Sequence, residues 1–339
     1  MRFSLFTTLA CLAVSHAAEY HGIIDPWSFD VDEGKFTDWM GAIDDDTRLS
    51  SLSIPGTHDS MAYHIRNSWV QTQIAFLAKQ LTGGIRYIDI TCRYQDSSIQ
   101  VYHGPHETGH SLSAVLEEIF DFLDQHPREA VILRIQRGGI FVDSKTFLET
   151  FDDVFVSGSY VGDRAIERIY TADDDVISVA PTLGQLRGKV LILEDFETER
   201  PGRYGLPWNK DTVTNYNYKF SLGGLFLESK WNSVKSHLSQ DPSPDSNILR
   251  ITHTTASFGA RPINIAARNS PSTGMNGFLG QYLKNSESKC FGIIVMDFPG
   301  KHLVQNILAH NNKYRAPDSA RLPSDDTDTV PVEASYSNA

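Results

Sequence analysis

The sequence predicts an α/β protein that folds as a single distorted (β/α)8 barrel of the TIM type. Short apolar, β-branched runs alternate with longer stretches of helical periodicity, which is typical of parallel strands covered by helices. Six or seven such runs occur in a chain of 339 residues, and polar residues follow several of them. An open, doubly wound sheet is the alternative, but no GxGxxG loop follows an early run to favour it.

The strands are expected where apolar and β-branched residues are most concentrated. In chain order they lie at 51–55, 86–91, 130–135, 189–194, 248–253 and 292–297, with a weaker candidate near 216–220. Between the second and third strands, apolar residues recur at helical spacing from Leu112 to Leu123, and Pro127 ends this run. A helix is therefore expected there.

The two ends of the chain have compositions that set them apart from the barrel. Residues 1–17 combine a basic start, an apolar stretch and a small-residue cleavage site, as in a secretory signal peptide. Residues 316–339 are rich in Pro, Ser and Asp and are expected to form a disordered acidic tail. Between them we expect an N-terminal lead-in at 18–44 and the barrel at 45–315, in a protein that is secreted from the cell.

The net charge limits the classes of partner. A value of −12 disfavours nucleic acid, whose phosphates require a basic face. It also argues against adhesion to anionic membranes by charge alone. Contact with a membrane then requires the insertion of apolar or aromatic side chains.

Loss of the signal peptide leaves two cysteines, Cys92 and Cys290. Cys92 lies at the end of the second predicted strand, whereas Cys290 precedes the last strand and so belongs to the opposite end of the barrel. A strand of six residues rises about 20 Å, and a disulfide requires Cα atoms within about 7 Å. Both thiols are therefore expected to be free.

Polar residues collect where the predicted strands end. They are His58, Asp59, Asp89, Thr91, Gln136, Glu194, Asp195 and Asp297. The carboxyl ends of the strands of a parallel barrel share one face, and this face carries the active site in such barrels. The convergence of these side chains predicts a functional site at this face.

Four segments follow one another in the order and spacing of a known family. They are "LSIPGTHDSM" from residue 52, "GGIRYIDITCR" from 83, "IQVYHG" from 99 and "VLEEIFDFLDQHPREAVILRI" from 115. This succession resembles the X-domain of phosphatidylinositol-specific phospholipase C in its small secreted microbial form. The later "RPINIAARNS" and "GIIVMDFPG" resemble the start of that family's last helix and its last strand, so the similarity extends over about residues 45 to 312.

The resemblance implies a distorted TIM barrel that cleaves the phosphodiester of phosphatidylinositol, giving diacylglycerol and a cyclic inositol phosphate. It assigns His58 as general base and His103 as general acid, a pair of roles that suits histidine because its pKa is near neutrality. It pairs Asp297 with His58 and gives Asp59 a supporting role beside His103. Asp89 completes the catalytic set that the resemblance carries over.

The chain departs from the family at the residue that contacts phosphate. Secreted bacterial members carry an arginine where this chain has Thr91, and calcium-dependent members carry a carboxylate there. Arg93, which shares the strand parity of Thr91, and Arg134 on the next strand are the expected replacements. No cofactor is then needed.

The alternative is a Ca²⁺ ion on Asp59, Asp89, Glu194 and Asp195, whose hard oxygen ligands suit that metal. Gln136, however, stands where the calcium-dependent members of the family carry a glutamate.

Recognition of the head group and of the membrane also differs from the family pattern. Tyr218 matches a tyrosine that stacks on the sugar ring, but Tyr216 replaces an aspartate, and Glu194-Asp195 replace an arginine. The expected substrate is a phospholipid or a glycerophosphoinositol-type compound. Because of these departures, a head group other than plain inositol stays open. Trp69 falls in the segment that carries an interfacial tryptophan in bacterial relatives, so it is either a transient membrane contact or a packing residue.

Three other functions stay open at this point. The first is a calcium-dependent phosphodiesterase of the same fold. The second is a barrel that binds lipid or inositol phosphate and has lost efficient turnover with the missing arginine. The third is a glycosidase that uses two strand-end carboxylates, which the pair of histidines disfavours.

Overall fold

The protein is described by a computed structural model. It describes residues 18–139, 144–156, 158–172, 176–218, 227–240, 247–255, 259–268, 273–287 and 290–316. The predicted signal peptide, 1–17, and all but the first residue of the predicted acidic tail lie outside these residues.

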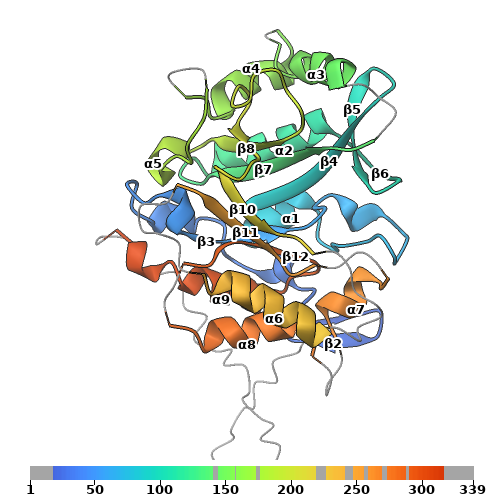
Figure 1. The fold of residues 1–339 in the computed structure, drawn as a ribbon, viewed down its shortest axis with the longest axis vertical. Coiled ribbons are helices and arrows are strands. Elements are labelled where there is room, and N and C mark those ends of the chain that lie inside the picture. The colour runs from blue at the N-terminus through green and yellow to red at the C-terminus, as the bar shows by residue number, and fades with distance from the viewer. Residues whose placement is uncertain are drawn as a thin grey trace, which may run out of the picture.

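A curled sheet of parallel strands forms the centre of the molecule (Figure 1). Neighbouring strands follow the order β10-β11-β12-β3-β4-β7-β8-β9. Their bounds are β3 Ser53–Thr57, β4 Tyr87–Gln95, β7 Val131–Arg137, β8 Val190–Asp195, β9 Leu206–Pro207, β10 Val213–Tyr216, β11 Leu249–His253 and β12 Gly292–Met296. Among the described residues no ladder joins β9 to β10. The continuous order of parallel strands confirms the predicted single distorted barrel, and the barrel is open between β9 and β10.

All six strong strand predictions are confirmed. They correspond to β3, β4, β7, β8, β11 and β12, and each observed strand begins within two residues of the predicted first residue. The weaker candidate near 216–220 corresponds to β10, which begins three residues earlier, at Val213. The second strand is longer than expected because its far half pairs with a hairpin, and β4 therefore continues to Gln95.

This hairpin consists of β5, Ser98–His103, and β6, His106–Ser111, and it is antiparallel to β4. Asp96 and Ser97 form the two-residue turn into β5 with φ of 49° and 61°. Positive φ at both residues is the geometry that matches the twist of a tight hairpin. The hairpin ends β5 at His103 and so carries this residue toward the barrel mouth.

Helices cover the outside of the sheet. The predicted helix is α2, Leu112–Gln125, whose buried stripe includes every apolar position that predicted it, and the Ser111 hydroxyl caps it by accepting from Ala114 N at 3.2 Å. In Figure 1, α2, α3 and α4 lie on one side of the sheet, and α6, α8 and α9 lie on the other. The remaining bounds are α1 Leu77–Thr82, α3 Ser144–Asp153, α4 Tyr160–Arg168, α5 Leu183–Leu186, α6 Leu227–Leu238, α7 Pro262–Ala266, α8 Met275–Lys284 and α9 Lys301–Ala309.

The lead-in at 18–44 packs against the barrel at both ends. Its first part forms a two-stranded ladder of β1, Ala18–Tyr20, and β2, Ile23–Asp25. Phe29 N then donates to Phe298 O at 3.1 Å, beside the end of β12. At the opposite end, the buried Arg86–Glu129 ion pair holds the lead-in, because Glu129 Oε1 also accepts from Gly41 N at 2.8 Å.

The two cysteines of the barrel are free, as predicted: Cys92 is buried and Cys290 is half-buried. Within the described part of the chain, no helix is long and apolar enough to cross a membrane.

Candidate active site

The segment after β3 turns sharply and brings His58 to the carboxyl end of the barrel. His58 N donates to Met296 O at 3.0 Å, which continues the pairing of β3 with β12. The next residue, Asp59, has a φ of +40°. This left-handed conformation is held by the surroundings, since the Thr72 hydroxyl donates to Asp59 O at 3.1 Å and Ser60 N donates to Asp89 O at 2.9 Å. A non-glycine residue in this conformation is typical of a functional site.

His58 is buried together with a carboxylate partner. Its Nδ1 lies 3.0 Å from Asp297 Oδ1, and each residue is 1% exposed. Burial raises the pKa of Asp297, and the neighbouring His58 opposes this rise. With the carboxylate as acceptor, Nδ1 carries a proton and Nε2 is the basic nitrogen of the ring. Asp297 thus orients the imidazole and stabilises its charged form.

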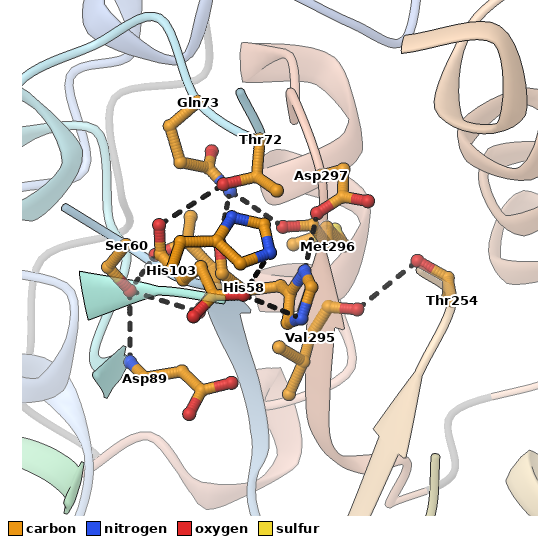
Figure 2. A network of polar contacts seen from close by, with 12 residues as sticks. His58, Ser60, Thr72, Gln73, Asp89, His103, Thr254, Val295, Met296 and Asp297 are labelled. Atoms are coloured by element: carbon orange, nitrogen blue, oxygen red, sulfur yellow. Dashed lines mark hydrogen bonds and ion pairs between the residues drawn. The ribbon is translucent and has the colours of Figure 1, made fainter. Parts of the chain in front are cut away.

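Asp59 joins the two predicted catalytic histidines. Its Oδ2 lies 3.1 Å from His58 Nε2 and 3.0 Å from His103 Nε2. The ring centroids of His58 and His103 are 5.7 Å apart and the rings are steeply inclined. Figure 2 shows the two rings in one cluster with Asp297. One carboxylate oxygen therefore marks a position from which both Nε2 atoms are within hydrogen-bonding reach.

The loop that carries Asp297 is held by side-chain amides that the sequence did not single out. Asn276 Nδ2 donates to the carbonyl oxygens of Asp297 at 3.0 Å and Phe298 at 3.2 Å. Gln73 Nε2 donates to His58 O and Met296 O, both at 3.0 Å. The Gln73 contacts tie the ends of β3 and β12 together, and the Asn276 contacts fix the loop after β12 to α8. Both amides are buried, but a single Asn or Gln in a sequence carries no signal of such a role.

Arg134 occupies the barrel beside this cluster. Its Nη1 lies 2.8 Å from Asp89 Oδ1, and its Nη2 lies 2.5 Å from Asp195 Oδ2. Its guanidinium stacks at 4.4 Å over the Trp208 ring. Burial acts to lower the pKa of Arg134, but the two carboxylates outweigh it and raise the pKa above its ordinary value. Arg134 therefore stays charged, and its charge is offset by its own partners.

Arg93 and Thr91 lie on the far half of β4. Arg93 donates to Gly104 O, in the turn that follows His103, and its guanidinium stacks over the Tyr102 ring at 4.7 Å. The Thr91 hydroxyl faces Gln136 Oε1 at 3.5 Å. Arg93 is thus placed to hold the turn that directly follows the second histidine.

Comparison with known proteins identifies the family. The model of the phosphatidylinositol-specific phospholipase C X domain matches residues 52–195. A 1-phosphatidylinositol phosphodiesterase of Listeria monocytogenes is 32% identical over 292 residues, which cover 81% of this chain and 85% of that protein. The chain belongs to the phosphatidylinositol-specific phospholipase C family.

Solved structures agree with this assignment. The phosphatidylinositol-specific phospholipase C of Listeria monocytogenes has a TM-score of 0.66 at 28% identity, covering 81% of this chain and 98% of that one. A Staphylococcus aureus phosphatidylinositol-specific phospholipase C mutant, at 18% identity and a TM-score of 0.64, shares the fold. A Staphylococcus aureus 1-phosphatidylinositol phosphodiesterase is 28% identical over 45% of this chain and 49% of its own length.

In this phospholipase C family member, other protein groups already hold the four carboxylates considered for Ca²⁺, and Asp59 lies between His58 and His103. Glu194 accepts from the backbone N–H groups of Gly202, Tyr204 and Gly205 at 2.8, 2.6 and 2.9 Å. Asp89 and Asp195 hold Arg134 from two sides. Over the described ranges, no group of three or more His, Cys, Asp or Glu side chains is arranged to hold a metal ion. The structure thus does not bring the four carboxylates together.

The side of the phospholipase barrel formed by β10 and β11 contributes two residues that the sequence analysis did not name. Lys230, on α6, is 5% exposed, and its Nζ donates to Tyr218 O at 2.5 Å. The Tyr218 side chain itself is 58% exposed. His253 ends β11 and is fully buried, with its ring 5.9 Å from the His58 ring. Both residues become visible only in the fold, because their strands and helices are far from His58 in sequence.

Proposed function

We propose that this protein cleaves the phosphodiester of phosphatidylinositol-type lipids, with His58 as general base and His103 as general acid. One observation carries the proposal: His58 Nε2 and His103 Nε2 both lie within 3.1 Å of Asp59 Oδ2. Two imidazoles that converge on one point can act on the attacking and the leaving oxygen of the same phosphorus. Two relatives, from Listeria monocytogenes and Staphylococcus aureus, are named 1-phosphatidylinositol phosphodiesterase, which supports this substrate.

The proposed reaction is an internal displacement. His58 Nε2 takes the proton of an inositol hydroxyl, whose oxygen forms a bond to phosphorus. The bond from phosphorus to the glycerol oxygen breaks, and His103 gives that oxygen a proton. Diacylglycerol and a cyclic inositol phosphate result. Asp297 stabilises the His58 imidazolium, and Asp59 turns from its bridging position to support His103 while the phosphate contacts both rings.

The proposed reaction uses no organic cofactor or metal. Arg93, Arg134, Thr91 and Tyr218 are the proposed substrate contacts. Among them Arg93 is the cation nearest the general acid, since it is bonded to the turn after His103. Asp89 acts through Arg134, whose guanidinium it orients.

The proposed place of action is a membrane outside the cell. Residues 1–17 have the composition of a signal peptide. Trp69, in the loop after β3, is 55% exposed, and the Arg261 guanidinium lies 5.5 Å from its ring centroid. An exposed indole beside a cation suits a transient contact with the polar surface of a bilayer, because the ring is amphipathic.

Turnover of phosphatidylinositol vesicles tests the proposal. Wild type, His58→Ala and His103→Ala are compared with His64→Ala, an exposed histidine in the same loop, and phosphorus NMR identifies the water-soluble product. We expect a cyclic product from wild type and from the control, a loss of about 10²-fold or more in each catalytic variant, and no effect of chelator. Loss of turnover in chelator would favour the calcium-dependent reaction, and no turnover of any lipid would favour a binding barrel.

A further inference from the structure

The lead-in pairs with the loop that carries Asp297. Phe29 N donates to Phe298 O at 3.1 Å, and Ser28 forms an isolated antiparallel bridge with Pro299. These two partners are the residues that directly follow Asp297 in the chain. The backbone of the lead-in is therefore bonded to the backbone of the loop immediately after the carboxylate that contacts the general base.

Two glycines allow the lead-in to approach the barrel closely at this junction. Gly300 N donates to Trp27 O at 2.9 Å, and a Cβ on Gly300 would lie only 2.7 Å from Ser28 N. A Cβ on Gly280, in α8, would lie 2.3 Å from the Trp27 ring. Only a residue without a side chain permits such an approach. The lead-in is thus fitted to the barrel at this place and does not merely cover it.

Both phenylalanines of the junction have left-handed backbone conformations. The φ angle is +81° at Phe29 and +47° at Phe298, in the region that favours glycine. A bulky residue keeps such a conformation only where its surroundings hold it. The two rings are buried and meet edge to face, with their centroids 6.1 Å apart. The lead-in and the loop therefore hold each other in strained conformations, which are typical of a functional site.

The Ser28 side chain connects the lead-in to the amide that holds Asp297. Its hydroxyl accepts from Asn276 Nδ2 at 3.0 Å, and the same Nδ2 donates to Asp297 O at 3.0 Å. Both Ser28 and Asn276 are fully buried. Burial raises the pKa of Asp25, and a side-chain hydrogen bond from Ser28 opposes this rise. A row of buried polar side chains thus leads from Asp25 in the lead-in to the backbone of Asp297.

The lead-in also contacts the segment that supports Asp59. The Tyr20 hydroxyl donates to Gln71 Oε1 at 3.1 Å, and the Tyr20 ring centroid lies 6.2 Å from that of Phe298. The next residue after Gln71 is Thr72, whose carbonyl accepts from Phe298 N at 2.9 Å and whose hydroxyl donates to Asp59 O at 3.1 Å. The supports of both carboxylates in the catalytic cluster therefore meet at the lead-in.

We propose that Ser28 and Phe29 are positioning residues, which set the contact of Asp297 with His58 and make this part of the lead-in a component of the active site. They act through the backbone of the loop and touch neither the substrate nor the reacting atoms. This inference rests on the proposed function, because it takes His58 as the general base. When Asp297 shifts, its 3.0 Å contact with His58 Nδ1 weakens, and the imidazolium that forms during the reaction is stabilised less.

The test compares wild type with Phe29→Ala, Ser28→Ala and the conservative variant Phe29→Leu. Ile43→Ala is the matched control, because Ile43 is also a buried apolar residue of the lead-in but lies at the opposite end of the barrel. The values of kcat and KM are measured on phosphatidylinositol vesicles, and circular dichroism gives the melting temperature. Proton NMR follows the downfield signal of the His58 Nδ1–H that faces Asp297, which requires no turnover.

We expect Phe29→Ala to lower kcat by about tenfold or more with KM nearly unchanged, as a displaced catalytic group predicts. The downfield signal should weaken or shift in the same variant. Ser28→Ala should show both effects to a smaller extent, and Phe29→Leu should keep most of kcat. Ile43→Ala should lower the melting temperature while kcat and the downfield signal stay at their wild-type values.

Wild-type kcat and an unchanged signal in both Phe29→Ala and Ser28→Ala would overturn the inference. An equal fall of kcat in Ile43→Ala and Phe29→Ala would also overturn it, since it would show only a general loss of stability. If Phe29→Ala does not fold, Ser28→Ala decides by the same two measurements. Absence of turnover in wild type would count against the proposed function, and the NMR signal would then decide this inference alone.

Discussion

The Nδ1 atom of His58 lies 3.0 Å from Oδ1 of Asp297, in a pair that solvent does not reach. Asp297→Asn keeps the shape of this side chain but can present an amide N–H to Nδ1, which favours the wrong tautomer of His58. By analogy with the aspartate of a hydrolase triad, kcat on phosphatidylinositol should fall by about 10³- to 10⁴-fold. Asp38→Asn is the control, because Asp38 also pairs with a histidine, His126, at 2.7 Å on the exposed surface. An Asp297→Asn enzyme with wild-type kcat would contradict the role of Asp297.

Asp59 should act mainly on the departure of the leaving group, through His103. Asp59→Asn removes the carboxylate that lies 3.0 Å from His103 Nε2, and kcat on the lipid should fall by about 10²-fold or more. A substrate with a good leaving group, such as a 4-nitrophenyl inositol phosphate, needs little help from an acid. The deficits of Asp59→Asn and His103→Ala should shrink on that substrate, and that of His58→Ala should not. Equal deficits on both substrates would show that Asp59 serves His58 instead.

Most of the barrel was predictable because its strands are continuous apolar runs. β7 and β12, for example, are buried on both faces and so have no polar alternation to blur the pattern. The hairpin β5–β6 was missed because "SIQVYHGPHETGHS" is mostly polar and packs by pairing with β4, not by its own hydrophobicity. Propensity gives little information where a neighbouring strand supplies the stability.

The sequence predicts those site residues that directly follow a recognisable strand or belong to a recognisable motif, and it does not predict the others. His58, Asp59, His103 and Asp297 come together as expected. Glu194 turns away from Arg134, since successive residues of a strand face opposite sides. Of the two neighbours Glu194 and Asp195, it is Asp195 that reaches the guanidinium. Lys230 had no signal, because one lysine among the polar residues of a helix is ordinary until the tertiary fold buries it.

Arg134 should be a large contributor to stability. Arg134→Met leaves Asp89 and Asp195 without their cation, and Asp89 is 3% exposed. Breaking such a buried pair costs about 3–5 kcal/mol in the free energy of unfolding, which urea titration measures. Arg137→Met is the matched control. Arg137 Nη2 lies 3.8 Å from Glu197 Oε2, and the Glu197 side chain is 81% exposed, so this ion pair is on the surface. Arg137→Met should lower the free energy of unfolding by less than about 1 kcal/mol. An equal loss in both variants would show that the buried Arg134 pairs stabilise the fold no more than the exposed Arg137 pair does.

Lys230 should lower the stability of the protein at neutral pH. Its pKa is about 8 in the folded protein, below the ordinary 10.5. Between these values the unfolded chain binds a proton that the folded protein does not bind, so the unfolding free energy rises with pH through this window. Below pH 8 the cost of Lys230 is complete and amounts to about 3 kcal/mol. Lys230→Met should therefore stabilise the protein near pH 7, and its advantage should decline as the pH rises from 8 to 10.5.

The difference between the two unfolding curves isolates Lys230. The other titratable groups around α6 are present in both proteins. They are Tyr216 and Tyr218 near β10, Arg250 and His253 on β11, Asp297 after β12, Glu228, Lys235 and His237 on α6 itself, and Tyr282 and Lys284 on α8. A difference that does not change with pH would mean that Lys230 titrates normally and bears no cost of burial.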